Sequence, residues 1–317
     1  MTDGRPVVVT GGAGAIGHIL VGRLLESGSE VRVIDNLSSG RAEHLESFRG
    51  NPKLKLVVAD LRQPAQYASE FRGAGAVWHL AANPDIRLGT SDPTVDLEQG
   101  TIATFRVLDV ARTNDVPSVR FSSSSVVYGY PSVFPTPESY GPLLPQSQYG
   151  GAKLACEAML SAFAHSYGIE AHIFRFANIV GPRMTHGVIY DFFEKLRRDS
   201  ARLEVLGDGR QAKSYLRTEE CVDAMLLAAE KAHERANVFN LGTTDRISVR
   251  EIAEKVVAAH GGRARIEYTG GSTGWVGDIP QQLLAVDRIR TLGWVARRTS
   301  AQAVDETIAE LLRGRVG

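Results

Sequence analysis

The stretch Thr10–Gly17, TGGAGAIG, constrains the fold more than any other part of the chain, because it spaces glycines three residues apart. It follows the apolar run Pro6–Thr10 (PVVVT), which predicts a buried strand, and it opens Ile16–Ser27, whose apolar spacing predicts a helix. A side chain at the first or second glycine would obstruct the turn and hold the backbone away from a pyrophosphate, and the third glycine lets the helix pack closely on the sheet. The helix N-terminus offers free N–H groups to the same anion. A turn without a ligand is the alternative, which the strand and helix on either side disfavour.

Asp35 indicates which dinucleotide such a turn would hold. It ends the second predicted strand, eighteen residues after the last glycine of the turn, where its carboxylate can accept hydrogen bonds from both hydroxyls of an adenosine ribose. The same charge would repel a 2′-phosphate, so NAD is favoured over NADP. Arg41 lies close in sequence and raises the NADP alternative, but Asp35 already occupies the position. Asp60 and Leu61, after the third strand, are expected beside the adenine, with a helix cap as the alternative for Asp60.

Strand-like and helix-like segments alternate through the first half of the chain. Short apolar runs predict strands over Pro6–Thr10, Glu30–Asp35, Leu54–Asp60, Ala76–Ala81, Ser118–Ser122 and Ala171–Phe176. Leu, Val and Phe at spacings of three and four predict long helices over Val95–Asn114 and Tyr149–Tyr167. This alternation predicts an α/β fold of Rossmann type, a doubly wound parallel sheet with helices on both faces.

The pattern loosens after about residue 178. It predicts helices over Gly187–Arg198, Glu219–His233, Arg250–His260 and Thr299–Leu312, and a strand over Ala236–Leu241. We expect residues 1–177 to form an NAD-binding Rossmann domain, to which the chain returns around residues 215–245. We expect residues 178–317 to form a smaller, interleaved α/β lobe that covers the mouth of the sheet and binds the substrate.

Composition excludes several classes of protein. The 317 residues include 36 basic and 36 acidic side chains, and a formal net charge of zero argues against binding nucleic acid or a membrane surface by bulk charge. The cysteines, Cys156 and Cys221, are too few and too far apart for a disulfide scaffold, and no metal site is expected. No apolar run reaches the roughly 18 residues of a membrane helix, and no signal peptide is evident, so we expect a cytoplasmic protein.

Tyr149 and Lys153 form a Tyr-x-x-x-Lys motif on one face of a predicted helix. A free tyrosine has a pKa near 10, so a working base at neutral pH requires a decrease of about three units, roughly 4 kcal/mol. The Lys153 ammonium and a positively charged nicotinamide can supply that in a partly dry pocket. The motif follows Phe121–Gly129 (FSSSSVVYG), a serine-rich strand end placed where α/β sheets bind ligands. Ser124 is the best candidate there to hydrogen-bond a substrate hydroxyl and share its proton with Tyr149.

With these motifs, the chain resembles the extended short-chain dehydrogenase/reductases and, within them, the archaeal-type UDP-glucose 4-epimerases. The resemblance covers nearly the whole chain. It is carried by TGGAGAIG, VIDNLSSG, HLAANPDIR, FSSSSVVYG, YGGAK, RFANIVGPR, HGVIYDF, LEVLGDGRQAKSY and GWVGD. The first five motifs also occur in dehydratases and decarboxylases of the superfamily, whereas HGVIYDF and GWVGD resemble the archaeal-type epimerases most closely.

The resemblance implies an NAD-dependent 4-epimerase of nucleotide sugars, acting on UDP-glucose and UDP-galactose or on the N-acetylhexosamine pair through a transient 4-keto sugar. It implies catalytic roles for Tyr149, Lys153 and Ser124. It implies NAD binding by Gly11, Gly14, Ala15, Ile16, Gly17, Asp35, Asn36, Ser38, Gly40, Asp60, Leu61, Leu80, Ala81, Ala82, Ser122, Tyr149 and Lys153. It implies sugar-nucleotide binding by Ser124, Asn178, Val188, Lys213, Tyr215 and Asp278. It also implies a homodimer joined through residues 95–114 and 149–167.

Departures from the family pattern indicate which reaction and which carrier to expect. Dehydratases of the family carry an Asp-Glu pair where Ser125 and Val126 stand, and decarboxylases carry Glu in place of Val126, so the chain fits epimerisation better than elimination. The family places arginines for the diphosphate at the positions of Lys213 and Trp275. Lys213 keeps the charge but loses the bidentate fork. Trp275 either stacks on a base or packs.

Several questions stay open at this point. Arg183 and Arg217 are candidates to replace the missing diphosphate arginines, with a surface position as the alternative for Arg183, and Gly100 replaces an Asn that commonly supports the cofactor loop. His18, His79 and His186 lie near the motifs and are expected to be packing or surface residues rather than ligands. The alternative functions are a dehydratase or an epimerase of a modified sugar in a biosynthetic pathway, and a non-catalytic dinucleotide-binding regulator.

Overall fold

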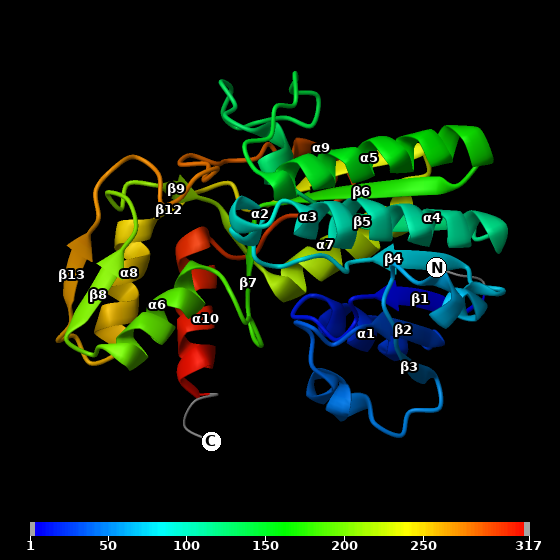
Figure 1. Ribbon diagram of the computed structural model, residues 1–317, viewed down its shortest axis with the longest axis horizontal. Coiled ribbons are helices and arrows are strands. Elements are labelled where there is room, and N and C mark those ends of the chain that lie inside the picture. Colours follow the sequence, from blue (N-terminus) through cyan, green and yellow to red (C-terminus); the bar gives the residue numbers. More distant parts are fainter. Residues whose placement is uncertain (1–3, 314–317) are drawn as a thin grey trace.

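A seven-stranded parallel sheet forms the centre of the molecule (Figure 1). The computed structural model describes residues 4–313, and the strand order is β11-β6-β5-β4-β1-β2-β3, with every neighbouring pair parallel. The strands are β1 (Val7–Thr10), β2 (Val31–Asp35), β3 (Leu54–Val58), β4 (Ala76–His79), β5 (Ser118–Ser124), β6 (Glu170–Phe176) and β11 (Ala236–Leu241). This sheet confirms the predicted Rossmann-type fold. Its order reverses between β1 and β4, and such a reversal opens a crevice at the carboxyl ends of the strands.

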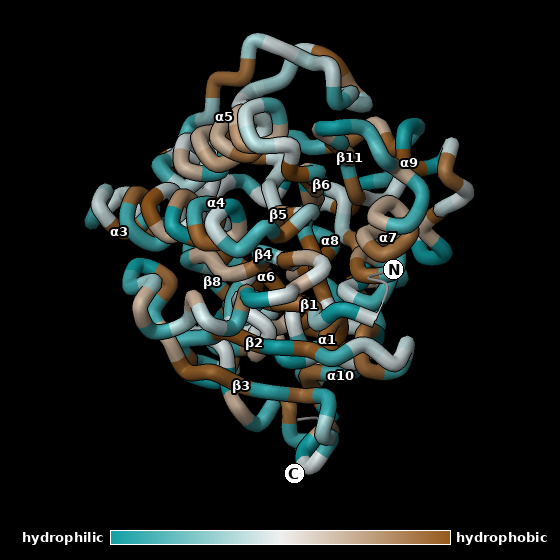
Figure 2. Tube along the Cα trace, turned by 90° about the vertical axis from the view of Figure 1, so that its right-hand side faces the viewer, coloured by the Kyte–Doolittle hydropathy of each residue, from teal (hydrophilic) through white to brown (hydrophobic). Residues whose placement is uncertain are grey.

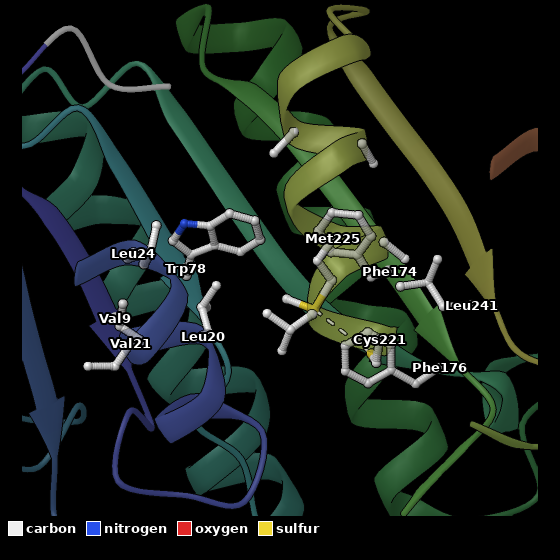
Figure 3. Close-up of a cluster of buried hydrophobic side chains, with 14 of the residues drawn as sticks. Val9, Leu20, Val21, Leu24, Trp78, Phe174, Phe176, Cys221, Met225 and Leu241 are labelled. Atoms are coloured by element: carbon white, nitrogen blue, oxygen red, sulfur yellow. Dashed lines mark hydrogen bonds between the residues drawn. The ribbon is translucent and has the colours of Figure 1, made fainter. Parts of the chain in front are cut away.

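Burial of both sheet faces explains why the strands read as continuous apolar runs. Val7 and Val9 of β1 belong to one cluster of buried side chains and Val8 to another, because successive side chains of a strand point to opposite faces. Figure 3 shows the first cluster. In it, Trp78 of β4 stacks on Phe174 of β6, with ring centroids 6.2 Å apart. The inner strands are therefore covered by helices on both faces, whereas β3, at the edge of the sheet, leaves Val58 62% exposed.

Helices cover the two faces of the sheet (Figure 2). The helices α1 (Gly17–Glu26) and α7 (Thr218–Lys231) contribute to the cluster on one face, and α4 (Ala103–Thr113) and α5 (Gln148–Tyr167) to the cluster on the other. The predicted homodimer contact through residues 95–114 and 149–167 would use α4 and α5, and it stays a prediction.

The predicted helix over Val95–Asn114 changes its hydrogen-bonding pattern along its length. The helix α3 (Thr94–Asp96) passes into a π-helical segment, η4 (Leu97–Ile102), before α4 begins. Gly100 lies within η4, and a Cβ built on it would be 3.2 Å from the Cβ of Ala152 in α5. A glycine weakens regular helix and here permits a close approach between neighbouring helices. The predicted helix over Val95–Asn114 is therefore confirmed, with a π-helical segment that the sequence did not predict.

The second half of the chain builds a smaller group of elements beside the sheet. The helices α6 (Val188–Arg198), α8 (Val249–Ala259) and α10 (Ser300–Arg313) share a separate cluster of buried apolar side chains with β8 (Arg202–Val205) and β13 (Arg265–Tyr268). From the same half, α7 and β11 return to the main sheet. The division near residue 178 into a cofactor domain and a substrate lobe remains our proposal, which these separate clusters support.

Short elements complete the fold. They are β7 (Asn178–Val180), β9 (Ala212–Lys213), β10 (Tyr215–Arg217), β12 (Ile247–Ser248), α2 (Leu88–Ser91), α9 (Asp287–Thr291) and the 3₁₀ helices η1 (Ala42–Phe48), η2 (Pro64–Gln66), η3 (Ala68–Phe71) and η5 (Ser125–Tyr128). Sequence periodicity did not predict them, because elements of two to seven residues contain too few repeats to show a pattern. No helix within residues 4–313 combines the length and the apolar character that crossing a membrane requires.

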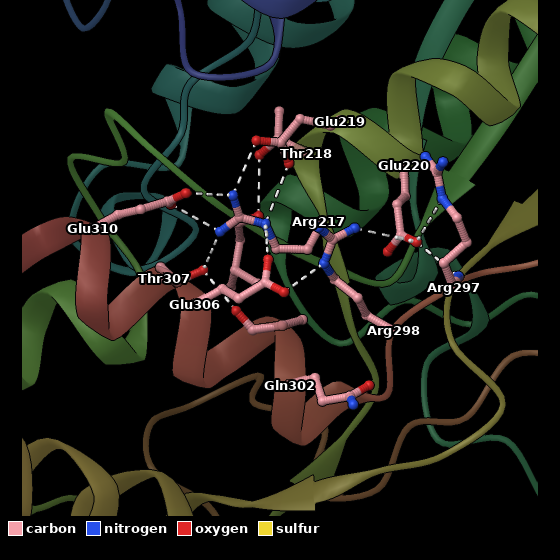
Figure 4. A network of polar contacts seen from close by, with 12 residues as sticks. Arg217, Thr218, Glu219, Glu220, Arg297, Arg298, Gln302, Glu306, Thr307 and Glu310 are labelled. Atoms are coloured by element: carbon pink, nitrogen blue, oxygen red, sulfur yellow. Dashed lines mark hydrogen bonds and ion pairs between the residues drawn. The ribbon is translucent and has the colours of Figure 1, made fainter.

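A buried arginine links the two parts of the molecule (Figure 4). The side chain of Arg217, at the end of β10, is 3% exposed. Its guanidinium donates to Oε1 of Glu219 in α7 at 2.9 Å, to Oε1 of Glu310 in α10 at 2.7 Å and to Oγ1 of Thr307 at 3.0 Å. One cation thus ties a helix of the main sheet to the last helix of the second part.

Replacing this arginine tests how strongly it links the two parts. We expect Arg217→Ala to lower the free energy of unfolding by about 2–4 kcal/mol, because it leaves partly buried carboxylates without their cation. Urea denaturation followed by circular dichroism measures this change. Arg202→Ala is the matched control: its ion pair with Glu267 is 53% exposed on the arginine side, and its loss should cost less than about 0.5 kcal/mol. Equal losses in both variants would contradict the assigned role.

Candidate active site

One cleft of about 950 Å³ brings together the residues that sequence reasoning assigned to the cofactor and the substrate. Every one of them lines it, from Gly11 after β1 to Asp278 near the end of the chain. The cleft lies at the carboxyl ends of the central strands, where the strand order reverses. The structure therefore shows that these residues share one cavity, and their individual roles stay proposals.

The glycine turn packs so tightly that two of its positions exclude any side chain. Gly11 has a φ of +70°, and a Cβ there would lie 2.7 Å from the backbone nitrogen of Ala81. A Cβ on Gly17 would lie 2.1 Å from the carbonyl oxygen of Gly11. At the start of α1, Ile16 is the N-cap and no side chain caps the helix, while the His18 nitrogen donates to the Gly14 carbonyl oxygen at 3.1 Å. This backbone cradle fits the pyrophosphate of a dinucleotide.

Asp35 is fixed at the end of β2 by the backbone around it. Its Oδ2 accepts a hydrogen bond from the Ala13 nitrogen at 3.0 Å, and its Oδ1 accepts one from the Leu37 nitrogen at 2.9 Å. Gly40 lies against it, because a Cβ on that residue would be 2.9 Å from Oδ2. The carboxylate is thus held against the turn and lines the cleft, as a ribose-binding group requires.

Asp60 lies on the cleft wall beyond β3. Its carboxylate accepts a hydrogen bond from Nη2 of Arg62 at 2.6 Å and another from the Arg62 backbone nitrogen at 2.9 Å. The hydrogen bonds from Arg62 lower the pKa of Asp60. The alternative role as a helix cap is wrong, because the N-cap of the next helix, η2, is Gln63.

His79 forms buried hydrogen bonds that hold the start of the turn in place, which the sequence did not reveal. It is the last residue of β4 and is fully buried, with Nδ1 2.7 Å from Oγ1 of Thr10 and Nε2 2.9 Å from Oγ1 of Thr104. Burial, helped by the charge of Lys153, lowers its pKa to about 3, so the ring is neutral. A neutral imidazole can donate one hydrogen bond and accept the other, which pins the end of β1 to α4.

Tyr149 and Lys153 lie in the first turns of α5, which opens with a capping hydrogen bond from the Gly150 nitrogen to Oγ of Ser147 at 3.1 Å. The Lys153 Nζ donates to the carbonyl oxygen of Ser122 at 2.7 Å and lies 5.6 Å from the centre of the Tyr149 ring. The helix thus presents both side chains to the end of β5, where Ser122 and Ser124 also line the cleft.

Burial shifts the two titrating groups in opposite directions. It raises the pKa of the Tyr149 phenol, and the Asp96 carboxylate adds to that increase. It lowers the pKa of the Lys153 ammonium to about 8, with Asp96 and Glu157 among the groups that oppose the decrease. The predicted decrease of the phenol pKa, which needs the Lys153 ammonium together with a positively charged nicotinamide, stays a prediction, and burial acts against it.

A buried polar network supports the strand end beneath this pair. Oγ of Ser123 donates to Oε1 of Glu157 at 2.5 Å, and Arg175 of β6 donates to both oxygens of that carboxylate, with Nη2 2.7 Å from Oε2. The third guanidinium nitrogen, Nη1, donates to the Tyr128 hydroxyl at 2.9 Å. Because these groups are buried and mutually satisfied, they fix β5, β6 and α5 relative to one another.

The opposite wall of the cleft carries the residues assigned to the sugar nucleotide. Lys213 donates from Nζ to Oδ1 of Asp278 at 2.6 Å, and the other oxygen of that buried carboxylate accepts from the Gly274 nitrogen at 2.9 Å. The Lys213 charge also lies 5.2 Å from the centre of the Trp275 ring. Asp278 therefore offsets the positive charge of Lys213. Asn178 donates from Nδ2 to the Ser214 carbonyl at 3.2 Å.

The two arginines considered as replacements for the diphosphate arginines lie in different places. Arg217 is not a substitute for the missing diphosphate arginines, because its guanidinium is occupied by Glu219 and Glu310 and is not part of the cleft wall. Arg183 does line the cleft. Among residues 4–313, no group of three or more His, Cys, Asp or Glu side chains is arranged to hold a metal ion.

Arg87 forms ion pairs across the cleft, a role that the sequence did not indicate. Arg87, after β4, donates from Nε to Oδ1 of Asp85 at 3.0 Å and from Nη1 to Oδ2 of Asp191 in α6 at 3.3 Å. Next to it, Nδ1 of His186 is buried and has no hydrogen-bond partner. The motif HLAANPDIR contains Asp85 and Arg87, but only the tertiary structure brings them to α6.

Comparison with known proteins agrees with this site. Residues 7–242 match the NAD dependent epimerase/dehydratase family. A UDP-glucose 4-epimerase of Mycolicibacterium smegmatis is 32% identical over 309 residues, covering 95% of this chain and 96% of that protein.

Solved structures give the same result. A crystal structure of a UDP-galactose 4-epimerase is 42% identical with a TM-score of 0.87, covering 98% of this chain and 99% of the other. A UDP-N-acetylglucosamine 4-epimerase from Methanobrevibacter ruminantium, solved with UDP-N-acetylmuramic acid, is 27% identical with a TM-score of 0.87, covering 99% of this chain and 100% of the other.

The tight packing of the turn gives a direct test of the cradle. We expect Gly17→Ala to weaken NAD binding by about 10- to 100-fold, because the added methyl group forces the turn to shift at a cost of about 1–3 kcal/mol. Fluorescence titration with NAD measures the change. Gly151→Ala is the control, since a Cβ at that helical glycine meets no atom within 4 Å. Unchanged affinity in Gly17→Ala would show that the turn does not bind the cofactor.

Proposed function

The chain belongs to the NAD-dependent epimerase/dehydratase family, and from that membership we propose that it is a 4-epimerase of UDP-linked hexoses. It is an NAD-dependent enzyme, since the family match spans residues 7–242 and the turn fits the dinucleotide. The similar proteins named UDP-glucose, UDP-galactose and UDP-N-acetylglucosamine 4-epimerases support the reaction and the uridine diphosphate carrier.

The observation that carries the proposal is that Tyr149, Lys153 and Ser124 share one cleft with the dinucleotide turn. In the proposed reaction the Tyr149 phenolate takes the proton of the sugar 4-hydroxyl, and Ser124 hydrogen-bonds the same oxygen and relays the proton. NAD, when bound, would supply the acceptor for the hydride that leaves C4, which is the C4 hydrogen with both bonding electrons, and a positive ring that favours the phenolate. Lys153, held by the Ser122 carbonyl, keeps an ammonium beside the phenol below about pH 8.

Epimerisation requires the electrons and the proton to return to the same carbon and oxygen. The 4-keto sugar turns over in the cleft, C4 regains its hydrogen with both bonding electrons on the other face, and Tyr149 returns the proton to the oxygen. No bond other than C4–H and O–H breaks and reforms, so the reaction balances without a further reactant. The residues need only hold the nucleotide part while the hexose rotates.

The residues after Ser124 support epimerisation over loss of water. Elimination needs an acid and a base beside C5 and C6 of the sugar, and Ser125 and Val126 occupy the place where such groups would stand. Oγ of Ser125 accepts a hydrogen bond from Nε2 of Gln282 at 2.8 Å, and Val126 lines the cleft with an apolar side chain. Neither residue can transfer a proton to or from carbon, which disfavours the dehydratase alternative.

The residues proposed to bind the sugar nucleotide would hold its diphosphate through several weak contacts. Asn178, Val188, Lys213 and Tyr215 line the wall opposite the turn, and we propose that they bind the diphosphate and the hexose. Because Asp278 already pairs with Lys213, this lysine contributes less net charge than the family's arginine would. We therefore expect micromolar rather than tighter affinity for the free nucleotide.

A screen of nucleotide sugars tests the proposed reaction. We expect purified protein with NAD to convert UDP-glucose to UDP-galactose, or UDP-N-acetylglucosamine to its galacto isomer, with NMR of the products showing inversion at C4 only. Loss of water from either sugar would establish the dehydratase alternative. Tight NAD binding without turnover of any nucleotide sugar would favour the non-catalytic regulator.

Tyr149→Phe tests the assigned base. We expect kcat to fall by about 10²–10⁴-fold while NAD stays bound, because the variant removes only the hydroxyl that transfers the proton. The control is Tyr167→Phe at the other end of α5, where the side chain is 55% exposed, and its kcat should stay within twofold of the parent. Turnover by Tyr149→Phe within tenfold of the parent would show that another group is the base.

A further inference from the structure

Arg183 stands apart from the other cations of the cleft by its position. It lies between β7 and α6, in the part of the chain assigned to the substrate, yet its guanidinium donates a hydrogen bond to the backbone carbonyl of His44 in η1, beside the dinucleotide turn. Arg183 and His44 both line the cleft. The contact therefore crosses from the substrate side of the cleft to the cofactor side, between residues 139 positions apart.

The His44 end of this contact is built into the turn. Nδ1 of His44 lies 2.7 Å from the carbonyl oxygen of Ala13, which also accepts from the Arg41 nitrogen at 3.1 Å. Nδ1 of His18 lies 3.0 Å from the carbonyl oxygen of Gly14. These hydrogen bonds occupy two carbonyl groups of the turn and hold them in place. Arg183 thus reaches the same few residues that present their backbone to the cofactor.

Arg183 brings an uncompensated positive charge to this place. Among residues 4–313 no carboxylate forms an ion pair with it, whereas the cleft cations Arg62, Arg87 and Lys213 are paired with aspartates. The two histidines add no charge, because burial lowers the pKa of His18 to about 4 and also lowers that of His44, with Arg183 contributing to both decreases. A guanidinium has five donor N–H groups, so the bond to His44 leaves others free for an anion.

The backbone of Arg183 indicates that its placement is specific. Its φ is +61°, in the left-handed region that a residue with a long side chain rarely adopts. Such a conformation persists where the surroundings impose it, and it is often found at ligand-binding segments. The exposed Arg198, in α6, also lines the cleft without a paired carboxylate among the described residues, but it belongs to a regular helix.

We propose that Arg183 is a clasp for the cofactor, which reaches across the cleft to the dinucleotide turn and binds the pyrophosphate of NAD through its guanidinium. The segment of residues 181–187 then closes over the bound dinucleotide, and release of NAD requires that segment to move away. This inference rests on the NAD dependence of the protein and holds whichever sugar reaction it catalyses. An enzyme that must return the electrons it has removed benefits from such a clasp, because the cofactor has to stay bound through a complete turnover.

Loss of NAD from purified protein tests the clasp without reference to catalysis. Protein saturated with NAD is passed through a desalting column, and the NAD that remains bound is released with acid and quantified over time. We expect Arg183→Ala to lose NAD at least tenfold faster than the parent. Arg183→Gln should behave like Arg183→Ala, because it keeps a donor for the His44 carbonyl but lacks the charge. Arg198→Ala is the matched control and should retain NAD within twofold of the parent.

Binding of UDP separates the clasp from the alternative that Arg183 serves the substrate diphosphate. We expect the Kd for UDP, measured by calorimetry on NAD-saturated protein, to change less than twofold in Arg183→Ala. A tenfold loss of UDP affinity with unchanged NAD retention would overturn the proposal, as would NAD retention equal to the parent in Arg183→Gln. Because the Arg183 side chain is exposed, both variants should unfold at the same urea concentration as the parent. The measurements of NAD retention and of UDP affinity stay valid even if the epimerase assay alone fails.

Discussion

The close contact between the glycine turn and the neighbouring strands is the constraint on which the rest of the structure depends. Gly11 and Gly17 lie so near to Ala81 and to each other's backbone that no side chain fits, and the tight turn of residues 11–16 can therefore join β1 to α1. The turn places the N-terminus of α1, which no side chain caps, at the cleft wall, because Ile16 and Gly17 line the cleft. Because parallel strands all end on one side, Asp35 of β2 and the serines of β5 reach the same cavity.

Burial sets the chemistry of this cavity as much as the identity of its residues does. Desolvation keeps the Tyr149 phenol protonated and lowers the pKa of Lys153 to about 8, so the side chains do not by themselves form a phenolate. The base that the proposed reaction needs therefore depends on a cation brought by the cofactor.

The arginines of this protein differ in whether a carboxylate pairs with them. Arg175 and Arg217 are buried with bound carboxylates and hold elements together, whereas Arg183 has no such partner and lines the cleft. From the sequence, both Arg183 and Arg217 were candidates for binding a diphosphate, and Arg183 was equally plausible as a surface residue. The difference between them comes from the acidic residues of α7 and α10, which surround only Arg217.

The sequence by itself determined the parallel α/β sheet, the dinucleotide turn, Asp35 at the end of β2 and the Tyr149–Lys153 pair, because strand and helix periodicity and short motifs are local properties of the chain. It did not reveal the hydrogen bonds of His79 to Thr10 and Thr104 or the ion pair between Arg87 and Asp191. Nor did it reveal the π-helical segment around Gly100 or which arginines pair with carboxylates. These features join residues that are distant in sequence or depend on what packs against them, and burial rather than residue type fixed the direction of the Tyr149 pKa. Only the tertiary structure decides them, since desolvation and long-range pairing have no local signature.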